Sequence, residues 1–221
     1  MTAPAAPTAP RILFGGTFDP VHRAHISCAR AVSRALGGAV VDLMPNAVPP
    51  HRPQPVASPE QRLDMLALAV AGHASLRVDP RELQRDGPSW TIDTLEALQR
   101  EEPRRPRILV MGADSFAGFD NWHRWQDYAR LCHLLVLPRP GADAPSARVQ
   151  ALFRETGADN LLASAAGNRL MLTAPVLDVS ATAVREALAR KGSCPAVSDP
   201  VLAYIRRHGL YNIGSGIQPG R

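Results

Sequence analysis

The chain has 221 residues, of which 45% are hydrophobic, so it is long enough to bury one sizeable core. Its net charge of +5 at pH 7 fits anionic partners and equally a solvated surface, because its arginines are scattered along the chain. Its three cysteines, Cys28, Cys132 and Cys194, lie far apart without CxxC or zinc-ligand spacing. This argues against a disulfide framework and a structural zinc site, and favours a reducing cytoplasm.

The N-terminal segment MTAPAAPTAP is rich in proline and alanine and lacks the basic start and apolar stretch of a signal peptide. We expect residues 1–10 to form a disordered tail, residues 11–212 one domain, and residues 213–221 a flexible C-terminal tail. The chain has no run of about 18 apolar residues, so we expect no membrane span and no membrane partner.

Short apolar runs alternate with helix-like segments along the chain. Strands are predicted over Arg11–Phe14, Ala39–Met44, Ser75–Val78, Arg107–Met111, Cys132–Leu137 and Leu170–Leu172. Helices are predicted over Ala24–Leu36, Pro59–Ala71, Thr91–Arg100, Trp125–Arg130, Ala147–Glu155, Ser180–Arg190 and Pro200–Arg207, with a proline-rich loop over Pro45–Pro55. This alternation predicts a single-domain α/β fold, a doubly wound, Rossmann-like, mostly parallel sheet with helices on both faces.

The segment GGTFDPVHRAH follows the first predicted strand and enters the first predicted helix, where open α/β sheets bind ligands. Gly15 and Gly16 allow the backbone to approach a ligand or to adopt positive φ, and Thr17 adds a hydroxyl. His22 and His25 share one face of the first helical turn and can donate hydrogen bonds to a phosphate. A plain turn and a pair of metal-binding histidines are alternatives. The spacing is neither GxGxxG nor GxxxxGK[ST], which disfavours a dinucleotide dehydrogenase and a P-loop.

This segment closely resembles GGTFDP[IV]HxGH, the signature of the nucleotidyltransferases with an HxGH motif, and within them of the nicotinate-nucleotide adenylyltransferases. Further segments in the same order resemble that family: PNAVPPHR, SWTIDTL, MGADS with NWHRW, DVSATAVR and YIRRHGLY. The likeness covers about residues 11–212, which makes chance agreement improbable. Two residues depart from the pattern. Ala24 stands in place of the HxGH glycine, and Ala181 in place of a small hydroxyl residue.

The resemblance implies adenylyl transfer from ATP to nicotinate mononucleotide, a step of NAD biosynthesis. The implied ATP-binding residues are Gly15, Gly16, Thr17, Phe18, His22, His25, Gly112, Asp114, Ser180, Thr182 and Arg185. Among them His22, His25, Thr17 and Arg185 are assigned to catalysis as donors to phosphate oxygens. Ser180 and Asp114 are alternatively helix N-caps. Asp19 is interpreted as an acceptor that braces the loop. Mg²⁺ is expected to arrive on the ATP phosphates, without a metal site built from protein carboxylates.

The resemblance also implies the residues that bind the mononucleotide. Trp122 is expected to stack on the pyridinium ring, although WHRW could equally be an aromatic pair in the core. Thr91 is expected at the nicotinate carboxylate or, alternatively, as an N-cap. The full set is Asn46, His51, Arg52, Thr91, Trp122 and His123.

Three other functions are weighed against this one. The same chemistry on nicotinamide mononucleotide or phosphopantetheine is the nearest, but the SWTIDTL and NWHRW segments disfavour phosphopantetheine. An RNA-binding module is disfavoured because aromatic residues make up only 5% of the chain and no RNA-binding signature occurs, so no nucleic-acid partner is expected. A fragment of a class I aminoacyl-tRNA synthetase is disfavoured because KMSKS is absent. Whether the protein forms a homo-oligomer is left open.

Overall fold

The computed structural model describes residues 9–47, 54–85, 90–139, 141–172, 177 and 179–213. The strands are β1 Arg11–Gly16, β2 Val41–Pro45, β3 Leu76–Val78, β4 Arg107–Gly112, β5 His133–Leu137, β6 Arg154–Glu155 and β7 Asn168–Met171. The α-helices are α1 Arg23–Ala35, α2 Pro59–Val70, α3 Thr91–Glu101, α4 Ala113–Ala117, α5 Ala147–Leu152, α6 Ala181–Lys191 and α7 Asp199–Arg207. Short 3-10 helices are η1 Phe119–Asn121, η2 Trp125–Arg130, η3 Ala158–Asn160 and η4 Leu210–Asn212.

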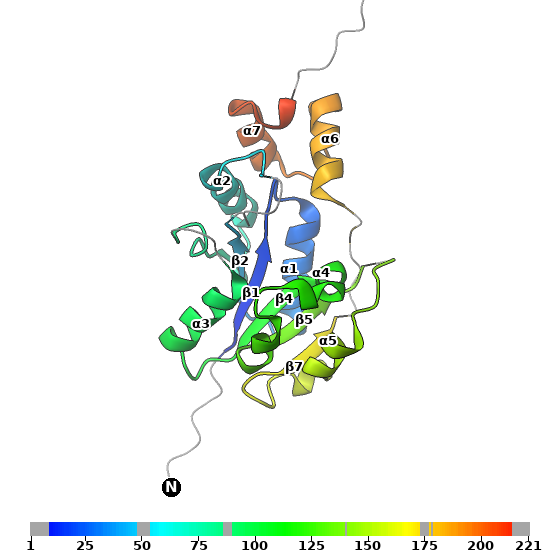
Figure 1. Ribbon diagram of the computed structural model, residues 1–221. Coiled ribbons are helices and arrows are strands. Elements are labelled where there is room, and N and C mark those ends of the chain that lie inside the picture. Colours follow the sequence, from blue (N-terminus) through cyan, green and yellow to red (C-terminus); the bar gives the residue numbers. More distant parts are fainter. Residues whose placement is uncertain are drawn as a thin grey trace, which may run out of the picture.

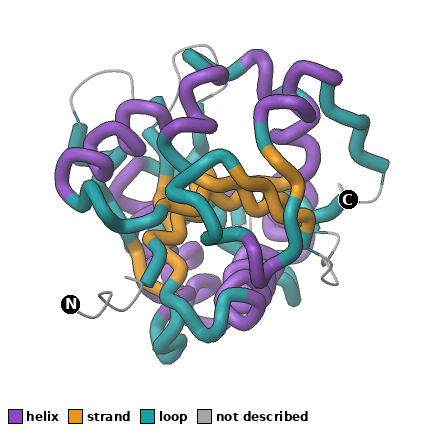
Figure 2. The backbone as a smooth tube through the Cα atoms, turned by 90° about the horizontal axis from the view of Figure 1, so that it is seen from below, coloured by secondary structure: helices purple, strands orange, loops and turns teal. Residues whose placement is uncertain are grey.

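The strands form one sheet in the order β3-β2-β1-β4-β5-β7-β6, and every pairing is parallel (Figure 1). Helices lie on both sides of the strands (Figure 2), which confirms the predicted doubly wound α/β fold. Parallel strands buried on both faces are continuously apolar, as ILF in β1 and ILVM in β4 are. Among the described residues, no helix has the length and apolar character needed to cross a membrane.

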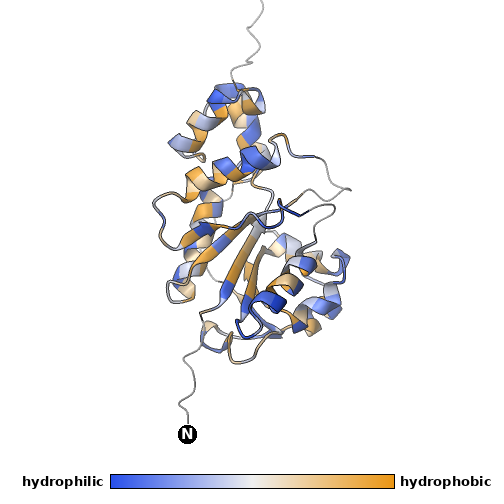
Figure 3. Cartoon of the chain, turned by 90° about the vertical axis from the view of Figure 1, so that its left-hand side faces the viewer, coloured by the Kyte–Doolittle hydropathy of each residue, from blue (hydrophilic) through white to orange (hydrophobic). Residues whose placement is uncertain are grey.

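The two faces of the sheet pack against different helices. On β1, Ile12 faces a core formed with α1, α2, α6 and α7, whereas Leu13 faces a core formed with α3 and α5. Neighbouring residues of a strand point to opposite faces, and helices cover both faces of the sheet, so both side chains are fully buried. Figure 3 shows the hydrophobic strands and helices that carry both hydrophobic and hydrophilic residues.

Several predicted element boundaries were wrong. The predicted helix Ala147–Glu155 ends at Leu152, because Phe153 is extended and inserts its ring against Phe119, and the next two residues form β6. Trp125–Arg130 is a 3-10 helix rather than an α-helix, and α4 was not predicted. β7 begins at Asn168, two residues before the predicted strand.

The strand order reverses direction at β1. Because β1 pairs with β2 on one side and with β4 on the other, the segments that leave β1 and β4 diverge. A crevice therefore opens at the carboxyl ends of these strands, which is where open α/β sheets bind ligands.

Candidate active site

The loop after β1 begins at the exposed Thr17 and is buried from Phe18 to His22. Phe18 has a φ of 51°, and the Asp19–Pro20 peptide bond is cis. A Cβ added at Gly16 would meet the Phe18 ring at 2.9 Å, whereas one added at Gly15 would meet nothing within 4 Å. Gly16 is therefore needed for the close approach of the Phe18 ring, and neither glycine has positive φ. Phe18 itself is buried and packs edge-on against His25, with 4.9 Å between ring centroids.

The loop ends in two stacked histidines at the start of α1. His22 is the N-cap, and its ring centroid lies 3.7 Å from that of His25. The His22 backbone N–H donates to Nδ1 of His25 over 3.2 Å, so a neutral His25 carries its proton on Nε2. Burial lowers the pKa of His22 to about 4, and burial together with His22 lowers the pKa of His25 to about 3. Both rings are therefore neutral N–H donors at pH 7.

A cavity of about 320 Å³ opens beside these histidines, within the size range of ligand pockets. Its walls come from α1, the start of α6 and the ends of β1, β4 and β5. They include Phe14, His22, Ala24, His25, Cys28, Gly112, Leu137, Pro138, Arg139, Val179, Ser180 and Ala181. Both residues that depart from the family pattern, Ala24 and Ala181, line this cavity. Relative to that pattern, Ala24 adds a methyl group to the cavity wall, and Ala181 removes a hydroxyl group from it.

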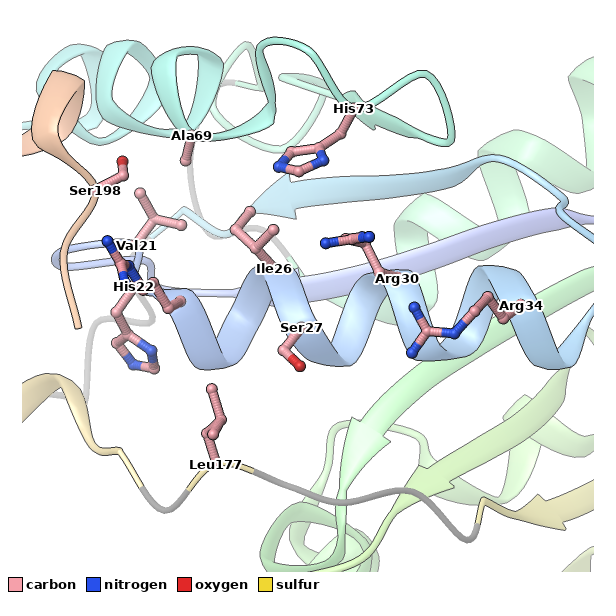
Figure 4. Close-up of a pocket in the computed structure, with 11 residues that line it drawn as sticks. Val21, His22, Ile26, Ser27, Arg30, Arg34, Ala69, His73, Leu177 and Ser198 are labelled. Carbon is pink, nitrogen blue, oxygen red and sulfur yellow. The ribbon is translucent and has the colours of Figure 1, made fainter. Parts of the chain in front are cut away.

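A second groove of about 370 Å³ runs along α1, and His22 lines it as well (Figure 4). Arg23, Arg30 and Arg34 make it basic, and no ion pair within the described part of the chain involves them. An anion that approaches His22 from this side therefore meets a positively charged wall, which favours its capture.

The segment VSATAVR brings Arg185 to the loop after β1. Ser180 is the N-cap of α6, and its Oγ accepts from the Ala183 backbone N–H over 3.1 Å. Arg185 donates through Nη1 to the Asp19 carbonyl over 2.8 Å and through Nη2 to Thr182 Oγ1 over 3.2 Å. Two motifs 166 residues apart in sequence are thus joined directly.

The Asp19 carboxylate connects the same loop to two further segments. It accepts from the backbone N–H groups of Val56, over 2.9 Å, and Ala57, over 3.1 Å, and from Tyr211 Oη over 2.8 Å. Burial and the nearby carboxylate raise the pKa of Tyr211. Asp19 is 5% exposed, and both its oxygens are occupied, as expected for an acceptor that braces the loop.

Among the residues expected at the mononucleotide, Thr91 is not the N-cap of α3, because Trp90 is, so the N-cap alternative for Thr91 was wrong. Trp122 packs against Phe119 and Tyr128, with ring centroids 5.3 and 5.8 Å away. It does not pair with Trp125 in any described ring contact. His123 stacks on Trp90 at 5.0 Å, which brings NWHRW to the start of α3.

The other predicted site residues divide between those the structure describes and those it does not. Asn46 follows β2, and its backbone N–H donates to the Gly16 carbonyl over 2.9 Å. Gly112 is the N-cap of α4, so Asp114 is not, and Asp114 pairs with Arg139. His51 and Arg52 lie outside the described residues.

Sequence reasoning missed two arginines near this edge of the sheet. Arg139 follows β5 at the mouth of the cavity, and no pattern in the sequence marks it. Arg62 is buried on α2 and hydrogen-bonds the main chain of Thr17 and Asn46. The sequence could have indicated that Arg62 is buried, because it shares a helical face with the hydrophobic residues Met65 and Leu66.

Comparisons with known proteins agree with this architecture. A family model described as cytidylyltransferase-like matches residues 13–187. A "Probable nicotinate-nucleotide adenylyltransferase" of Pectobacterium atrosepticum is 43% identical over 205 residues, covering 90% of this chain and 96% of the relative. One of Pseudomonas putida, with the same name, is 44% identical over 204 residues, covering 90% and 93%.

Solved structures share the fold. A Plasmodium falciparum nicotinic acid mononucleotide adenylyltransferase complexed with NaAD aligns with a TM-score of 0.72 over 93% of this chain and 99% of that one. The same enzyme complexed with APC aligns with a TM-score of 0.71. Both are 13% identical to this chain, so the likeness bears on the fold alone. The matched family model and the relatives above 40% identity show that this chain belongs to the cytidylyltransferase-like nucleotidyltransferases and, within them, to the nicotinate-nucleotide adenylyltransferases.

Proposed function

We propose that this enzyme transfers the adenylyl group of ATP to nicotinate mononucleotide, giving deamido-NAD and pyrophosphate, a step of NAD biosynthesis. The observation that carries the proposal is the meeting of the stacked pair His22 and His25 with Arg185 at one loop beside a cavity. The names of the relatives support the choice of acceptor.

The reaction needs positioning and charge stabilisation more than proton transfer. A phosphate oxygen of the mononucleotide bonds to the α-phosphorus of ATP, the bond from that phosphorus to the bridging oxygen breaks, and pyrophosphate leaves. The attacking phosphate has a second pKa of about 6, so it is mostly dianionic near pH 7 and needs no general base. His22 and His25, with pKa values lowered to about 4 and 3, then act as neutral donors to phosphate oxygens.

We assign the binding of the leaving pyrophosphate to residues at the start of α6. Arg185 carries a guanidinium that can hold two oxygens at once, and Thr182 and Thr17 add hydroxyl donors nearby. We assign Ser180, Gly15, Gly16 and Gly112 to the walls of the ATP site, and Phe18 to the support of His25.

ATP is expected to enter as its magnesium complex, since Mg²⁺ usually reaches such sites on substrate phosphates and keeps several waters. The chain's carboxylates fit this arrangement, because Asp19 already accepts three hydrogen bonds and Asp114 is paired with Arg139. Within the described residues, no group of three or more His, Cys, Asp or Glu could hold a metal ion.

The acceptor site lies, on this proposal, at the start of α3. The first N–H groups of a helix favour an anion, so Thr91 suits the nicotinate carboxylate. Trp122 and His123 are assigned to the pyridinium ring, and Asn46 with His51 and Arg52 to the phosphate of the mononucleotide.

The domain limits at residues 11 and 212 stay predictions. A cytoplasmic location also stays a prediction, and it is favoured by the free thiols of Cys28, Cys132 and Cys194.

The test is pyrophosphate release from MgATP with nicotinate mononucleotide, nicotinamide mononucleotide or phosphopantetheine as acceptor. We expect a strong preference for the first. A preference for another acceptor would leave the ATP site in place and overturn the roles of Thr91 and Trp122. No release with any acceptor would overturn the proposed activity.

A further inference from the structure

Arg62 is an arginine in a position where a core residue would be expected. It lies on α2 beside Met65 and Leu66, and its side chain is 0% exposed. Its Nη1 donates to two main-chain carbonyls, those of Thr17 and Asn46, each over 2.9 Å. A single buried nitrogen therefore joins two chain segments that follow different strands.

The two carbonyls belong to the two proposed substrate loops. Thr17 follows β1 and opens the loop that carries His22 and His25. Asn46 follows β2 and opens the loop assigned to the mononucleotide phosphate. The Asn46 backbone N–H also donates to the Gly16 carbonyl over 2.9 Å, so the loops are cross-linked at their first residues.

This arrangement costs the fold stability. No ion pair to Arg62 occurs within the described ranges, and its Nε and Nη2, like Oδ1 of Asn46, have no hydrogen-bond partner there. Burial lowers the pKa of the Arg62 guanidinium, while the charge of Asp19 acts in the opposite direction. A methionine of similar volume would fill the same space without a buried charge. Packing alone therefore does not account for an arginine at this position.

We propose that Arg62 is a positioning residue for adenylyl transfer: it fixes the separation of the ATP loop and the mononucleotide loop. This inference rests on the proposed function. Because each loop begins in its own strand, each substrate should still bind when the link is cut. In-line attack requires reacting atoms near 3 Å apart, so a misplacement of about 1 Å lowers turnover by up to about 100-fold.

The chain offers a matched control in Arg107. This arginine is 4% exposed and donates to the main-chain carbonyls of Leu131, over 2.7 Å, and Arg105, over 2.8 Å. It is the first residue of β4, at the opposite end of the sheet from the substrate loops. Arg62→Met and Arg107→Met each remove a buried guanidinium that holds main-chain carbonyls, but only Arg62→Met cuts a link between the two substrate loops.

The experiment measures kcat per folded molecule and the dissociation constants of each substrate alone, using a non-hydrolysable ATP analogue and nicotinate mononucleotide. For Arg62→Met we expect kcat to fall about 10- to 100-fold while each dissociation constant changes less than about 3-fold. For Arg107→Met we expect wild-type values of all three. Arg62→Lys should recover part of kcat, because an ammonium group can donate to both carbonyls.

Three results would overturn the inference. They are an unchanged kcat in Arg62→Met, an equal fall in kcat in Arg107→Met, and a weaker binding of one substrate with kcat unchanged. If Arg62→Met does not fold, Arg62→Lys, which restores the link only in part, should still have a lower kcat than Arg107→Lys, and equal kcat values in these two variants would overturn the inference. Failure of the proposed function is separate, since it would appear as a wild-type protein that releases no pyrophosphate with any acceptor.

Discussion

The ATP half and the mononucleotide half of the proposed site are held together in different ways. In the ATP half, Asp19, Arg185 and Tyr211 join distant segments by directional hydrogen bonds, and Asp19 and Tyr211 are buried. In the mononucleotide half, Trp122 and His123 are held by ring contacts on the edge of a core. Hydrogen bonds fix orientation more sharply than ring packing does. Changes in the first half should therefore act on turnover, and changes in the second on acceptor binding.

The largest effect is expected at His25. His25→Ala removes the Nε2–H donor that we assign to the transition state, and should lower kcat by roughly 100-fold or more. Steady-state pyrophosphate release measures it. His208→Ala is the matched control, because His208 is an exposed histidine that stacks on Tyr204 and is not assigned to a substrate. Near-normal turnover of His25→Ala would remove His25 from the chemistry.

The second-largest effect is expected for Asp19→Asn, a substitution in the ATP half. An amide turns one oxygen acceptor into an N–H donor that faces an existing donor, so the variant should lose about 3 kcal/mol of stability. For a chain of this length that is a drop in Tm of roughly 6–12 °C in thermal unfolding. Asp64→Asn is the control, since Asp64 accepts from Tyr204 Oη at the same 2.8 Å but on the exposed surface. Equal drops in the two variants would contradict the role given to burial.

Glu82, which contacts the α3 helix whose start is assigned to the acceptor, provides a test by pH. It is 1% exposed, accepts from Thr94 Oγ1 of α3 over 3.1 Å, and burial raises its pKa to about 7. Because the folded pKa lies above the unfolded value, the contribution of Glu82 to stability is present at low pH and is lost as pH rises through 7. Glu82→Gln cannot ionise, so relative to wild type it should gain about 2 kcal/mol between pH 5 and pH 8.

Chemical unfolding at the two pH values measures this difference between Glu82→Gln and wild type. A Glu60→Gln control should show no comparable gain, since Glu60 is solvent-exposed and hydrogen-bonds Ser58. A constant difference between Glu82→Gln and wild type across that range would mean that Glu82 is ionised in the folded protein.

Some parts of the fold and of the candidate site could be predicted from the sequence, and others could not. The fold and the positions of His22, His25 and Ser180 could be predicted, because apolar periodicity and short motifs are local in the chain. Phe153 could not, since its extended backbone depends on a ring contact with Phe119 in another element. Arg139 and the partners of Arg62 are likewise set by tertiary contacts. Arg62 itself could have been recognised from the sequence, because it is a polar residue on an apolar helical face.

The smallest expected effect is that of Trp122→Ala. Loss of one stacking surface for the pyridinium ring should raise KM for nicotinate mononucleotide about 10-fold, equivalent to roughly 1.4 kcal/mol, and leave KM for ATP unchanged. Trp125→Ala is the control, because Trp125 packs on the same core without an assigned contact to the acceptor. If both variants raise KM for the acceptor equally, the effect is a loss of packing in that core. If Trp122→Ala selectively weakens ATP binding instead, Trp122 belongs to the ATP half, and the division of the site into two halves is wrong.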